Sequence, residues 1–393
     1  MDLTAHRGEY VCLFADCIPV KGIRRSAIYD LTRADLHIFP TEYYPVLEWL
    51  TGRPVAAVLD ELDRAAASSQ PGNLDRLDEF LVFLFDNELA MFTADPSRFP
   101  SIELTWDYPG TVQNAILDVD TELHDFSAIL GQLDVLGCQF LQVRGFSALL
   151  TLDVCRQVLA FAANTSLTSV ELILRYDATV SDADLVRFMR TEPLVTSLTL
   201  HSAPARSLLS VAMADAQGTE PTSRRDVSFT PQVIDSEKHC GLITQAYLNA
   251  PSVGVYSEFR QFNGCLNRKI SVDSRGQIRN CPSMRASFGD ARSTGLAEAL
   301  GNPEFLAAWR ITKDTIDVCR GCEFRYVCSD CRAYLERPDD PRSKPLKCGY
   351  DPATGEWEPW YQPSFKAAVR ESYGIGRPGR TSQPGDSGER QEC

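Results

Sequence analysis

Several common signatures are missing from this sequence, and each absence removes a class of protein. No apolar run approaches the roughly 20 residues of a membrane helix, because the best stretch, 80–92, is interrupted by Asp86, Asn87 and Glu88. The opening residues, MDLTAHRGEY, lack the apolar core of a signal peptide, so we expect a cytoplasmic protein without a membrane partner. No P-loop, GxSxG or HExxH motif occurs, so phosphoryl transfer and hydrolysis have no motif support.

Basic residues are also scarce, but not evenly so. The chain has 39 Lys and Arg against 53 Asp and Glu, a net charge of −14, which argues against nucleic acid as a partner. Residues 264–348 differ, because they hold 15 Lys and Arg against 11 Asp and Glu. A bound anionic centre would explain a basic stretch inside an acidic chain.

Hydrophobic patterns divide the chain into four regions and predict an α/β protein. In the first region, 1–97, extended segments (YVCLF, SAIYDL, DLHIF), with a turn at IPVKG, precede three helical patterns and a last strand, ELAMFT. This order predicts a small winged-helix-like domain. The second region, 98–235, alternates strand-like segments (SIELTW, AILDVD, FLQVRG, VELILRY, VTSLTLHS) with helices at 125–136, 152–163 and 182–189. Such alternation favours a parallel sheet or a partial barrel, with 203–226 as a loop.

The third region, 236–363, is loop-rich, and the fourth, 364–393, has the composition of a disordered tail. The third region holds most of the chemistry, because eight of the thirteen cysteines lie between Cys240 and Cys348. Their spacing is C-x10-G-x4-C from Cys265, and C-x2-C-x5-C-x2-C-x16-C from Cys319. In a reducing cytosol this crowding indicates metal rather than disulfides.

Two kinds of metal site agree with these cysteines. Structural zinc sites and iron–sulfur clusters both take four thiolates, and the spacing does not separate them. Arg320, Arg325 and Arg332 lie among the cysteines in sequence, and cations would stabilise the negative charge of a thiolate-ligated cluster. Zinc bound by four thiolates is anionic as well, so the positive charge of these arginines favours clusters only weakly.

The cysteine pattern resembles the SPASM domain, the auxiliary-cluster domain of many peptide-modifying radical SAM enzymes. One departure is that two residues, not three, separate Cys328 from Cys331. Longer segments, CLFADCIPVKGIRRSAIYDL, CLNRKISVDSRGQIRNCPSM, VCRGCEFRYVCSDCRAY and SKPLKCGYDP, resemble the SPASM-domain peptide maturase of grasp-with-spasm systems over most of residues 10–357. Those systems pair such a protein with an ATP-grasp ligase and a short precursor peptide.

The resemblance implies two 4Fe-4S clusters, with zinc as the alternative. One cluster would be held by Cys319, Cys322, Cys328 and Cys348. The other would be held by Cys265, Cys281 and Cys331, with Cys240 as the nearest upstream candidate for its fourth ligand. The alternative is an open iron site, in which one iron of the second cluster has no cysteine ligand.

A radical SAM enzyme also needs a CxxxCxxC triad, which this sequence does not contain. Cys12 and Cys17 have four residues between them and no third partner. Where the first barrel strand and its cluster loop belong, the segment AILDVDTELHDFSAIL has no cysteine, and the turn Arg144–Ser147 replaces the expected GGEP-type turn. We therefore expect a degenerate radical-SAM-like barrel that does not bind S-adenosylmethionine, and we assign no catalytic residue.

The resemblance implies a maturation protein that binds a ribosomally made precursor peptide and works with an ATP-grasp ligase. Residues 1–97 are similar to the recognition element that binds a leader peptide as an added strand. A DNA-binding winged helix is disfavoured, because residues 1–100 hold 9 Lys and Arg against 16 Asp and Glu. Two alternatives stay open: a redox enzyme acting on the peptide at an auxiliary cluster without cleaving S-adenosylmethionine, and a zinc-stabilised interaction protein.

Overall fold

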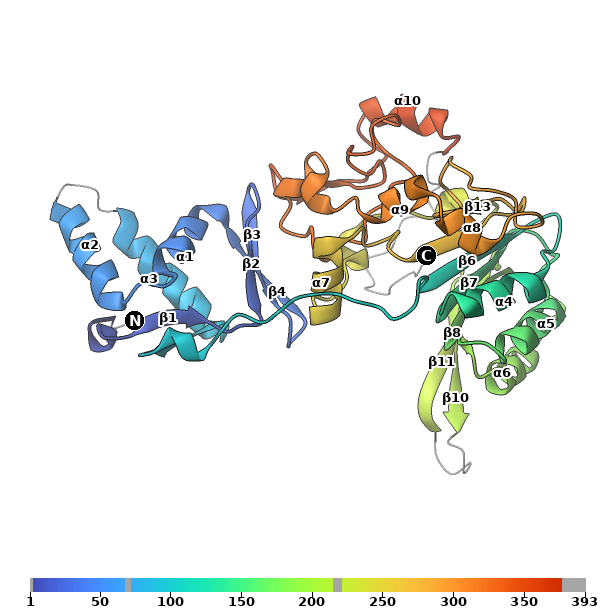
Figure 1. Cartoon of the computed structure of the whole chain (residues 1–393), viewed down its shortest axis with the longest axis horizontal. Coiled ribbons are helices and arrows are strands. Elements are labelled where there is room, and N and C mark those ends of the chain that lie inside the picture. The colour runs from blue at the N-terminus through green and yellow to red at the C-terminus, as the bar shows by residue number, and fades with distance from the viewer. Residues whose placement is uncertain (1–2, 68–71, 215–220, 377–393) are drawn as a thin grey trace.

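The computed structural model describes residues 3–67, 72–214 and 221–376 (Figure 1). Three parts follow one another along the chain: an N-terminal α/β region, a large sheet with helices on one face, and a cysteine-rich region of short elements. An extended segment, 99–113, leads from the first part to the second. No helix among the described residues is long and apolar enough to cross a membrane.

The N-terminal region has the predicted order of strands, three helices and a last strand. Its elements are β1 (Tyr10–Leu13), β2 (Cys17–Val20), β3 (Arg25–Asp30), β4 (Asp35–Pro40), α1 (Tyr44–Leu50), α2 (Val55–Ala67), α3 (Gly72–Asp86) and β5 (Ala90–Thr93). β1 pairs with β5, while β2, β3 and β4 form a separate antiparallel sheet in that order. The predicted turn at 18–22 is wrong in its first half, because Ile18 to Val20 pair with β3. Pro19 is tolerated there because β2 is an edge strand.

Both faces of the β2–β3–β4 sheet are buried, and they are buried against different parts of the protein. Ile28 packs in the core formed with α1, α2 and α3. The next residue, Tyr29, packs edge-to-face on Tyr256 and Tyr326 of the cysteine-rich region. Successive residues of a strand point to opposite faces, so β3 alone joins two hydrophobic cores. The N-terminal region therefore shares its sheet with the rest of the molecule.

The second part is built on an eight-stranded sheet of order β10-β11-β9-β8-β7-β6-β12-β13. Its strands are β6 (Asn114–Val119), β7 (Phe140–Gly145), β8 (Ser169–Arg175), β9 (Val195–His201), β10 (Ser207–Ala214), β11 (Pro221–Phe229), β12 (Lys269–Val272) and β13 (Ile278–Arg279). All neighbours from β12 across to β11 are parallel, and the outermost strands β10 and β13 are antiparallel. Within the described residues the sheet is open and mostly parallel, and it does not close into a barrel.

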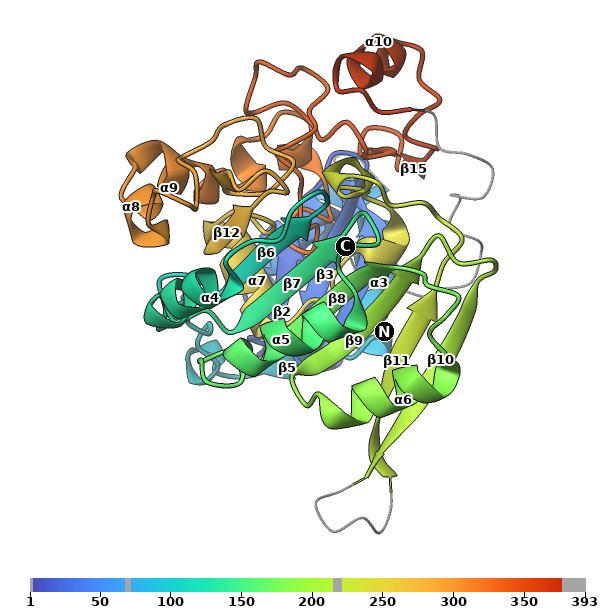
Figure 2. The same ribbon diagram turned by 90° about the vertical axis from the view of Figure 1, so that its right-hand side faces the viewer.

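Three helices cover one face of this sheet: α4 (Phe126–Val135), α5 (Leu152–Ala162) and α6 (Asp182–Thr191) (Figures 1 and 2). Each begins after a polar residue whose side chain accepts a hydrogen bond from a backbone N–H of the first turn. These N-caps are Asp125, Thr151 and Ser181. The structure thus confirms the three predicted helices and the strands between them.

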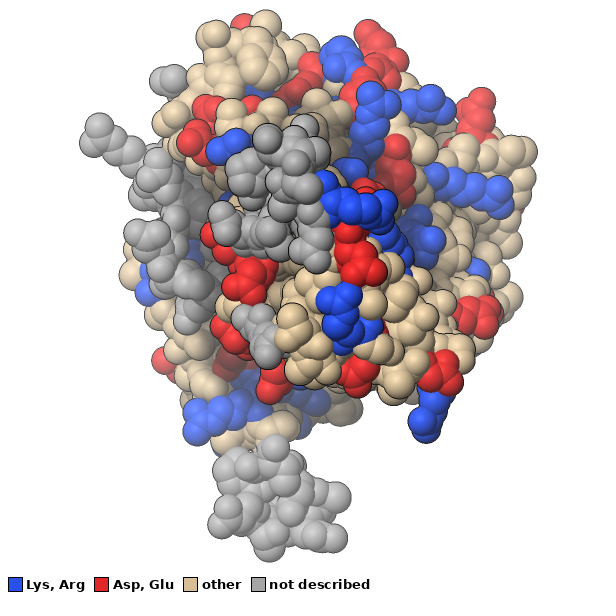
Figure 3. Space-filling model, turned by 90° about the vertical axis from the view of Figure 1, so that its left-hand side faces the viewer, with Lys and Arg blue, Asp and Glu red and all other residues tan. Residues whose placement is uncertain are grey.

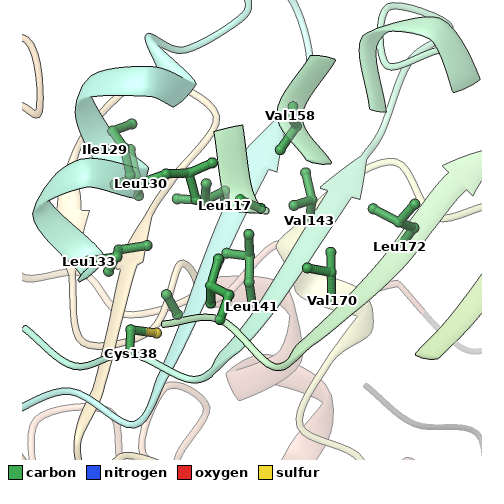
Figure 4. Packing of buried hydrophobic residues seen from close by; sticks show 14 of the residues in the cluster. Leu117, Ile129, Leu130, Leu133, Cys138, Leu141, Val143, Val158, Val170 and Leu172 are labelled. Atoms are coloured by element: carbon green, nitrogen blue, oxygen red, sulfur yellow. The ribbon is translucent and has the colours of Figure 1, made fainter. Parts of the chain in front are cut away.

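The core of this part lies between the sheet and the helices. Figure 4 shows alternate strand residues, Leu117, Leu141, Val143 and Leu172, packed against Ile129, Leu130, Leu133 and Val158 of the helices. The intervening strand residues must face the opposite side of the sheet. Several of those are polar and yet buried, notably Asp118, Gln142 and Arg144. The helix-free face of the sheet is therefore a buried polar layer.

Two predictions for this part are wrong. Residues 203–226 are predicted as a loop, but they form most of the β10–β11 hairpin, whose strand β11 pairs with β9. Their Ser- and Ala-rich sequence makes a strand because a partner strand is available. The segment SIELTW, 101–106, is predicted as a strand but pairs with none, although Ile102 and Leu104 pack against the cysteine-rich core. The alternate apolar residues of this segment pack on one side, but no strand of the described residues pairs with it.

The cysteine-rich region is loop-rich, as predicted. Its regular elements are α7 (Val253–Gln261), α8 (Leu296–Leu300), α9 (Pro303–Trp309), β14 (Tyr350–Asp351), β15 (Glu356–Trp357) and α10 (Phe365–Ser372). Helix α10 contradicts the predicted disorder from 364 onward, while 377–393 lie outside the described residues. The reason is Lys366, whose buried ammonium donates to the carbonyls of Leu346 and Cys348, both at 2.9 Å, and pairs with Glu336.

The N-terminal region is tied to the cysteine-rich region through Glu323, a fully buried carboxylate. It accepts hydrogen bonds from Arg25 at 2.8 Å and from the Tyr350 hydroxyl, while the Tyr29 hydroxyl donates to its backbone carbonyl at 2.6 Å. Burying one charged partner without the other is costly.

We predict that Glu323→Gln lowers the free energy of unfolding by about 2 kcal/mol, because Arg25 and Tyr350 lose a charged acceptor inside the interface. The matched control is Glu356→Gln, at an exposed glutamate of the same region. Urea unfolding and limited proteolysis measure the change. Equal stability of the two variants would contradict this role.

Candidate metal centres

Electrostatic effects between thiols link the eight cysteines of the C-terminal half in two sets. We call Cys319, Cys322, Cys328 and Cys348 the first quartet. We call Cys240, Cys265, Cys281 and Cys331 the second quartet. All eight lie outside the α-helices and β-strands, and the side chains that surround them set their positions.

The thiols of the first quartet affect one another electrostatically. Burial, opposed by Lys313 and assisted by Asp330, Cys348 and Cys328, raises the pKa of Cys319 to about 12. Burial also raises the pKa of Cys322 well above its usual value, with Cys319 and Cys328 adding to the effect. For Cys348, burial again raises the pKa and Cys328 raises it further. Because one thiolate raises another's pKa only at short range, these four side chains are neighbours.

The second quartet behaves in the same way. Burial raises the pKa of Cys281 to about 12, and the next contributions come from Cys265 and Cys240. Burial raises the pKa of Cys331 to about 11, again with Cys265 and Cys240 adding to it. Burial raises the pKa of Cys265 too, and Lys269 opposes this effect. Cys240 is thus electrostatically coupled to all three other members.

Neither quartet converges on a single point. Within the part of the chain that the structure describes, no three His, Cys, Asp or Glu side chains form a group that could hold a metal ion.

Cys240 comes from far upstream in the sequence, and three contacts hold it beside the other cysteines. The ammonium of Lys347, next to Cys348 in sequence, donates to the Cys240 carbonyl at 2.6 Å. Ile243 forms a parallel bridge with Cys348. Gly241 has φ +83°, and a Cβ at this position would lie 2.8 Å from the Cys331 Sγ. Only glycine fits this approach.

A buried carboxylate, Asp330, lies between the two quartets. It follows Cys328 by two residues and precedes Cys331, with φ +70°. It pairs with Lys313 at 3.1 Å and Arg332 at 2.7 Å, and accepts from the Asn263 amide at 2.7 Å. Burial alone would raise the pKa of Asp330, but Lys313 and Arg332 hold this pKa at about 2. Asp330 is therefore a stable anion that binds two buried cations.

The cations near the thiols are not those that the sequence singles out. Of the three predicted arginines, only Arg332 is buried beside the quartets, while Arg325 pairs with Asp314 and Arg320 is exposed. The direct contact to a thiol is made by Lys269, whose ammonium donates to the Cys265 Sγ at 3.6 Å. Lys313 lies near Cys319 and Cys328, and these thiols help to raise its pKa.

The carboxyl ends of β6 and β7 carry a buried ion pair. The Arg144 guanidinium binds both oxygens of Asp118, at 2.6 and 2.8 Å. Burial raises the pKa of Asp118, and Arg144 opposes that rise. Cys240 and Cys281 contribute to the raised pKa of Arg144, so the pair lies near the second quartet. In open parallel sheets ligands bind at this edge, next to the strand where the order reverses, which here is β6.

Three further cysteines of the described residues lie apart from the quartets. Cys17, Cys138 and Cys155 are buried, and burial raises the pKa of each to about 12. Cys138 and Cys155 belong to the core beneath the sheet. Their chemistry is that of small apolar side chains.

In comparisons with known proteins, no family model and no curated protein matches this chain. The geometry of the two quartets and the resemblance of the motifs are therefore the basis for assigning a function.

Sequence reasoning missed the groups that assemble the site. These are Lys269, Lys313, Asp330, Lys347 and Lys366. The one available signal was Asp330, because a carboxylate between two closely spaced cysteines is out of place beside anionic ligands unless cations neutralise it.

We predict that Asp330→Asn lowers the free energy of unfolding by about 3–5 kcal/mol, because Lys313 and Arg332 stay buried without their anion. The control, Asp339→Asn, changes an exposed aspartate of the same region and should cost little. Urea unfolding of both variants measures the difference. Similar midpoints for the two would show that Asp330 does not hold the region together.

Proposed function

We propose that this protein takes part in the maturation of a ribosomally made peptide, binding the precursor and working with an ATP-grasp ligase, as a SPASM-domain peptide maturase. Its two quartets would each hold a 4Fe-4S cluster. The protein would act by presenting the peptide to the ligase, which forms the new bond. The finer fold implied is a winged-helix-like recognition domain, a degenerate radical-SAM-like domain and a SPASM domain.

The grouping of the cysteines carries this proposal. The SPASM resemblance implies one set of Cys319, Cys322, Cys328 and Cys348, and another with Cys265, Cys281 and Cys331. The electrostatic neighbours in the structure follow the same division. The sequence spacing alone does not predict this division, since Cys331 is closest in sequence to Cys328 but is assigned to the other set. Cys240 supports a second set that is complete without an open iron site.

We assign clusters rather than zinc to the two quartets. Four thiolates that bind one zinc ion at about 2.3 Å must lie within roughly 4 Å of each other. No such group exists among the described side chains, although the thiols of each quartet are electrostatic neighbours. The preference for clusters rests on the SPASM resemblance, because four thiolates suit a 4Fe-4S cluster as well as zinc. When bound, such a cluster supplies one-electron transfer, and Lys269 and Lys313 would balance its negative charge.

The parallel sheet supports a role without radical chemistry. No cysteine triad is present in the sequence. At the edge where a cofactor would approach, Asp118 and Arg144 satisfy each other in a bidentate pair. This pair leaves both charges partnered, so neither needs a ligand. We therefore assign the sheet a structural role beside the second quartet.

The N-terminal region supports peptide recruitment through β4. This strand is an edge of the β2–β3–β4 sheet, and no other strand of the described residues pairs with its outer side. The opposite edge, β2, is a poorer acceptor because Pro19 has no N–H to donate. An extended leader peptide would add to β4 through backbone hydrogen bonds, with the exposed Ile38 as an apolar contact.

The metal assignment predicts two separable centres. Cys322→Ser should remove the iron of the first quartet and Cys281→Ser that of the second, each lowering iron and sulfide content by about half. Cys138→Ser is the matched control, since Cys138 is buried outside both quartets. Iron, sulfide and zinc analysis with absorption spectra after anaerobic purification measures the outcome.

Zinc without sulfide in the unaltered protein would replace the clusters by zinc sites. An unchanged metal content in both quartet variants would overturn the assignment altogether. Loss of metal from the Cys138→Ser control would mean that any core thiol change has the same effect.

Strand addition predicts that peptide binding depends on the backbone of the leader. N-methylation of single leader residues should weaken binding about tenfold at every second position, because alternate N–H groups point towards β4. Fluorescence anisotropy with the precursor peptide encoded beside this gene measures it, using the full-length protein. Methylation effects without a two-residue period would contradict binding as an added strand.

A further inference from the structure

A basic and apolar surface is exposed where the β2–β3 turn meets the loop that begins the first quartet. We call it the junction surface, and it consists of Lys21, Ile23, Arg24, Val318 and Arg320. Backbone hydrogen bonds fix its two segments side by side, because the Ile23 N–H donates to the Gly321 carbonyl at 2.9 Å. The Gly321 N–H in turn donates to the Val318 carbonyl at 3.1 Å.

The apolar part of this surface is maintained at a cost in backbone strain. Ile23 is 55% exposed and Val318 is 42% exposed. Val318 has φ +66°, a conformation that a β-branched residue adopts only under strain. Burial of its side chain does not explain the strain, because the side chain faces solvent. A tight turn accounts for this φ, because the Cys319 N–H donates to the Asp317 carbonyl at 2.7 Å. The turn leaves an apolar side chain at the surface, where it is available to another molecule.

The basic part of this surface includes arginines without an acidic partner among the described residues. Among the described residues, the side chains of Arg24 and Arg320 make no ion pair, and Lys21 meets Glu48 only at 3.7 Å. Two carboxylates of the adjoining segments are engaged elsewhere, since Glu323 pairs with Arg25 and Asp314 with Arg325. Seen from the N-terminal side, Lys and Arg gather over the upper right of the molecule (Figure 3).

We infer that the junction surface binds an acidic peptide segment that carries an apolar side chain. Arg24 and Arg320 would pair with its carboxylates, and Ile23 with Val318 would contact the apolar group. Charge complementarity selects this occupant, because unpaired guanidinium groups bind carboxylates in bidentate geometry. The bound segment would lie against the loop of Cys319 and Cys322, so the surface places a peptide beside the first quartet.

This site is separate from the β4 edge, and it does not depend on which metal the thiols hold. Its failure and the failure of the proposed function are therefore distinguishable, because metal analysis tests the quartets and peptide titration tests this surface.

The test uses the full-length protein with its metal as purified, and a fluorescein-labelled peptide rich in Glu with two Leu. We expect this peptide to bind more tightly than its counterpart with Lys in place of Glu. The double variant Arg24→Glu with Arg320→Glu should weaken binding about tenfold, and raising the salt from about 50 mM to about 500 mM should also weaken it. The matched control, Arg98→Glu with Arg187→Glu, reverses two exposed arginines elsewhere and should leave binding unchanged.

Val318→Gly separates strain from binding. Glycine accepts φ +66° without strain, so the variant should unfold at the same or a higher temperature while binding the Glu-rich peptide more weakly. Equal binding of the Glu and Lys peptides, or equal losses in the control and the junction variants, would overturn the inference. If Val318→Gly bound the Glu-rich peptide as tightly as the unaltered protein, the Val318 side chain would not be part of the peptide contact.

Discussion

The cysteine-rich region depends on one buried interaction, the pairing of the Asp330 carboxylate with Lys313 and Arg332. Asp330 lies between Cys328 of the first quartet and Cys331 of the second, so its position sets both. Lys313 and the third partner, Asn263, come from segments that follow α9 and α7, which brings distant parts of the chain to one point. In a region with few helices and strands, this charge network adds to the order that the hydrophobic core around Phe324 and Leu346 supplies.

The same arrangement of a buried acid with cationic or hydroxyl partners joins the N-terminal region to the quartets. Glu323 directly follows Cys322 and binds Arg25 of β3, while Tyr29 of the same strand packs on Tyr256 and Tyr326. A peptide bound at β4 would therefore be held by a sheet that rests on the first quartet. The junction surface is formed at this contact, so this surface and the first quartet belong to one structural unit.

The parallel sheet contributes rigidity and electrostatics. Its helix-free face is a polar layer in which Arg144 binds Asp118 and Gln142 donates to Glu171 at 3.0 Å. The positive charge of Arg144 interacts electrostatically with Cys240 and Cys281. The sheet can in this way act on the second quartet, because a buried cation stabilises thiolate charge without any chemistry of its own.

Local patterns in the sequence determined the elements of the first two parts. The alternation of strand-like and helix-like segments predicted α4, α5 and α6, since such patterns are properties of adjacent residues. The cysteine spacing predicted which residues bind metal, and the SPASM resemblance divided these residues into two sets. Only the tertiary structure decided the β10–β11 hairpin, the helix α10 and the cations at the quartets. A strand needs a partner, Lys366 needs the carbonyls it binds, and Asp330 needs Lys313 and Arg332, all of which are distant in the chain. Burial and long-range charge are properties of the folded molecule, and no window of neighbouring residues contains them.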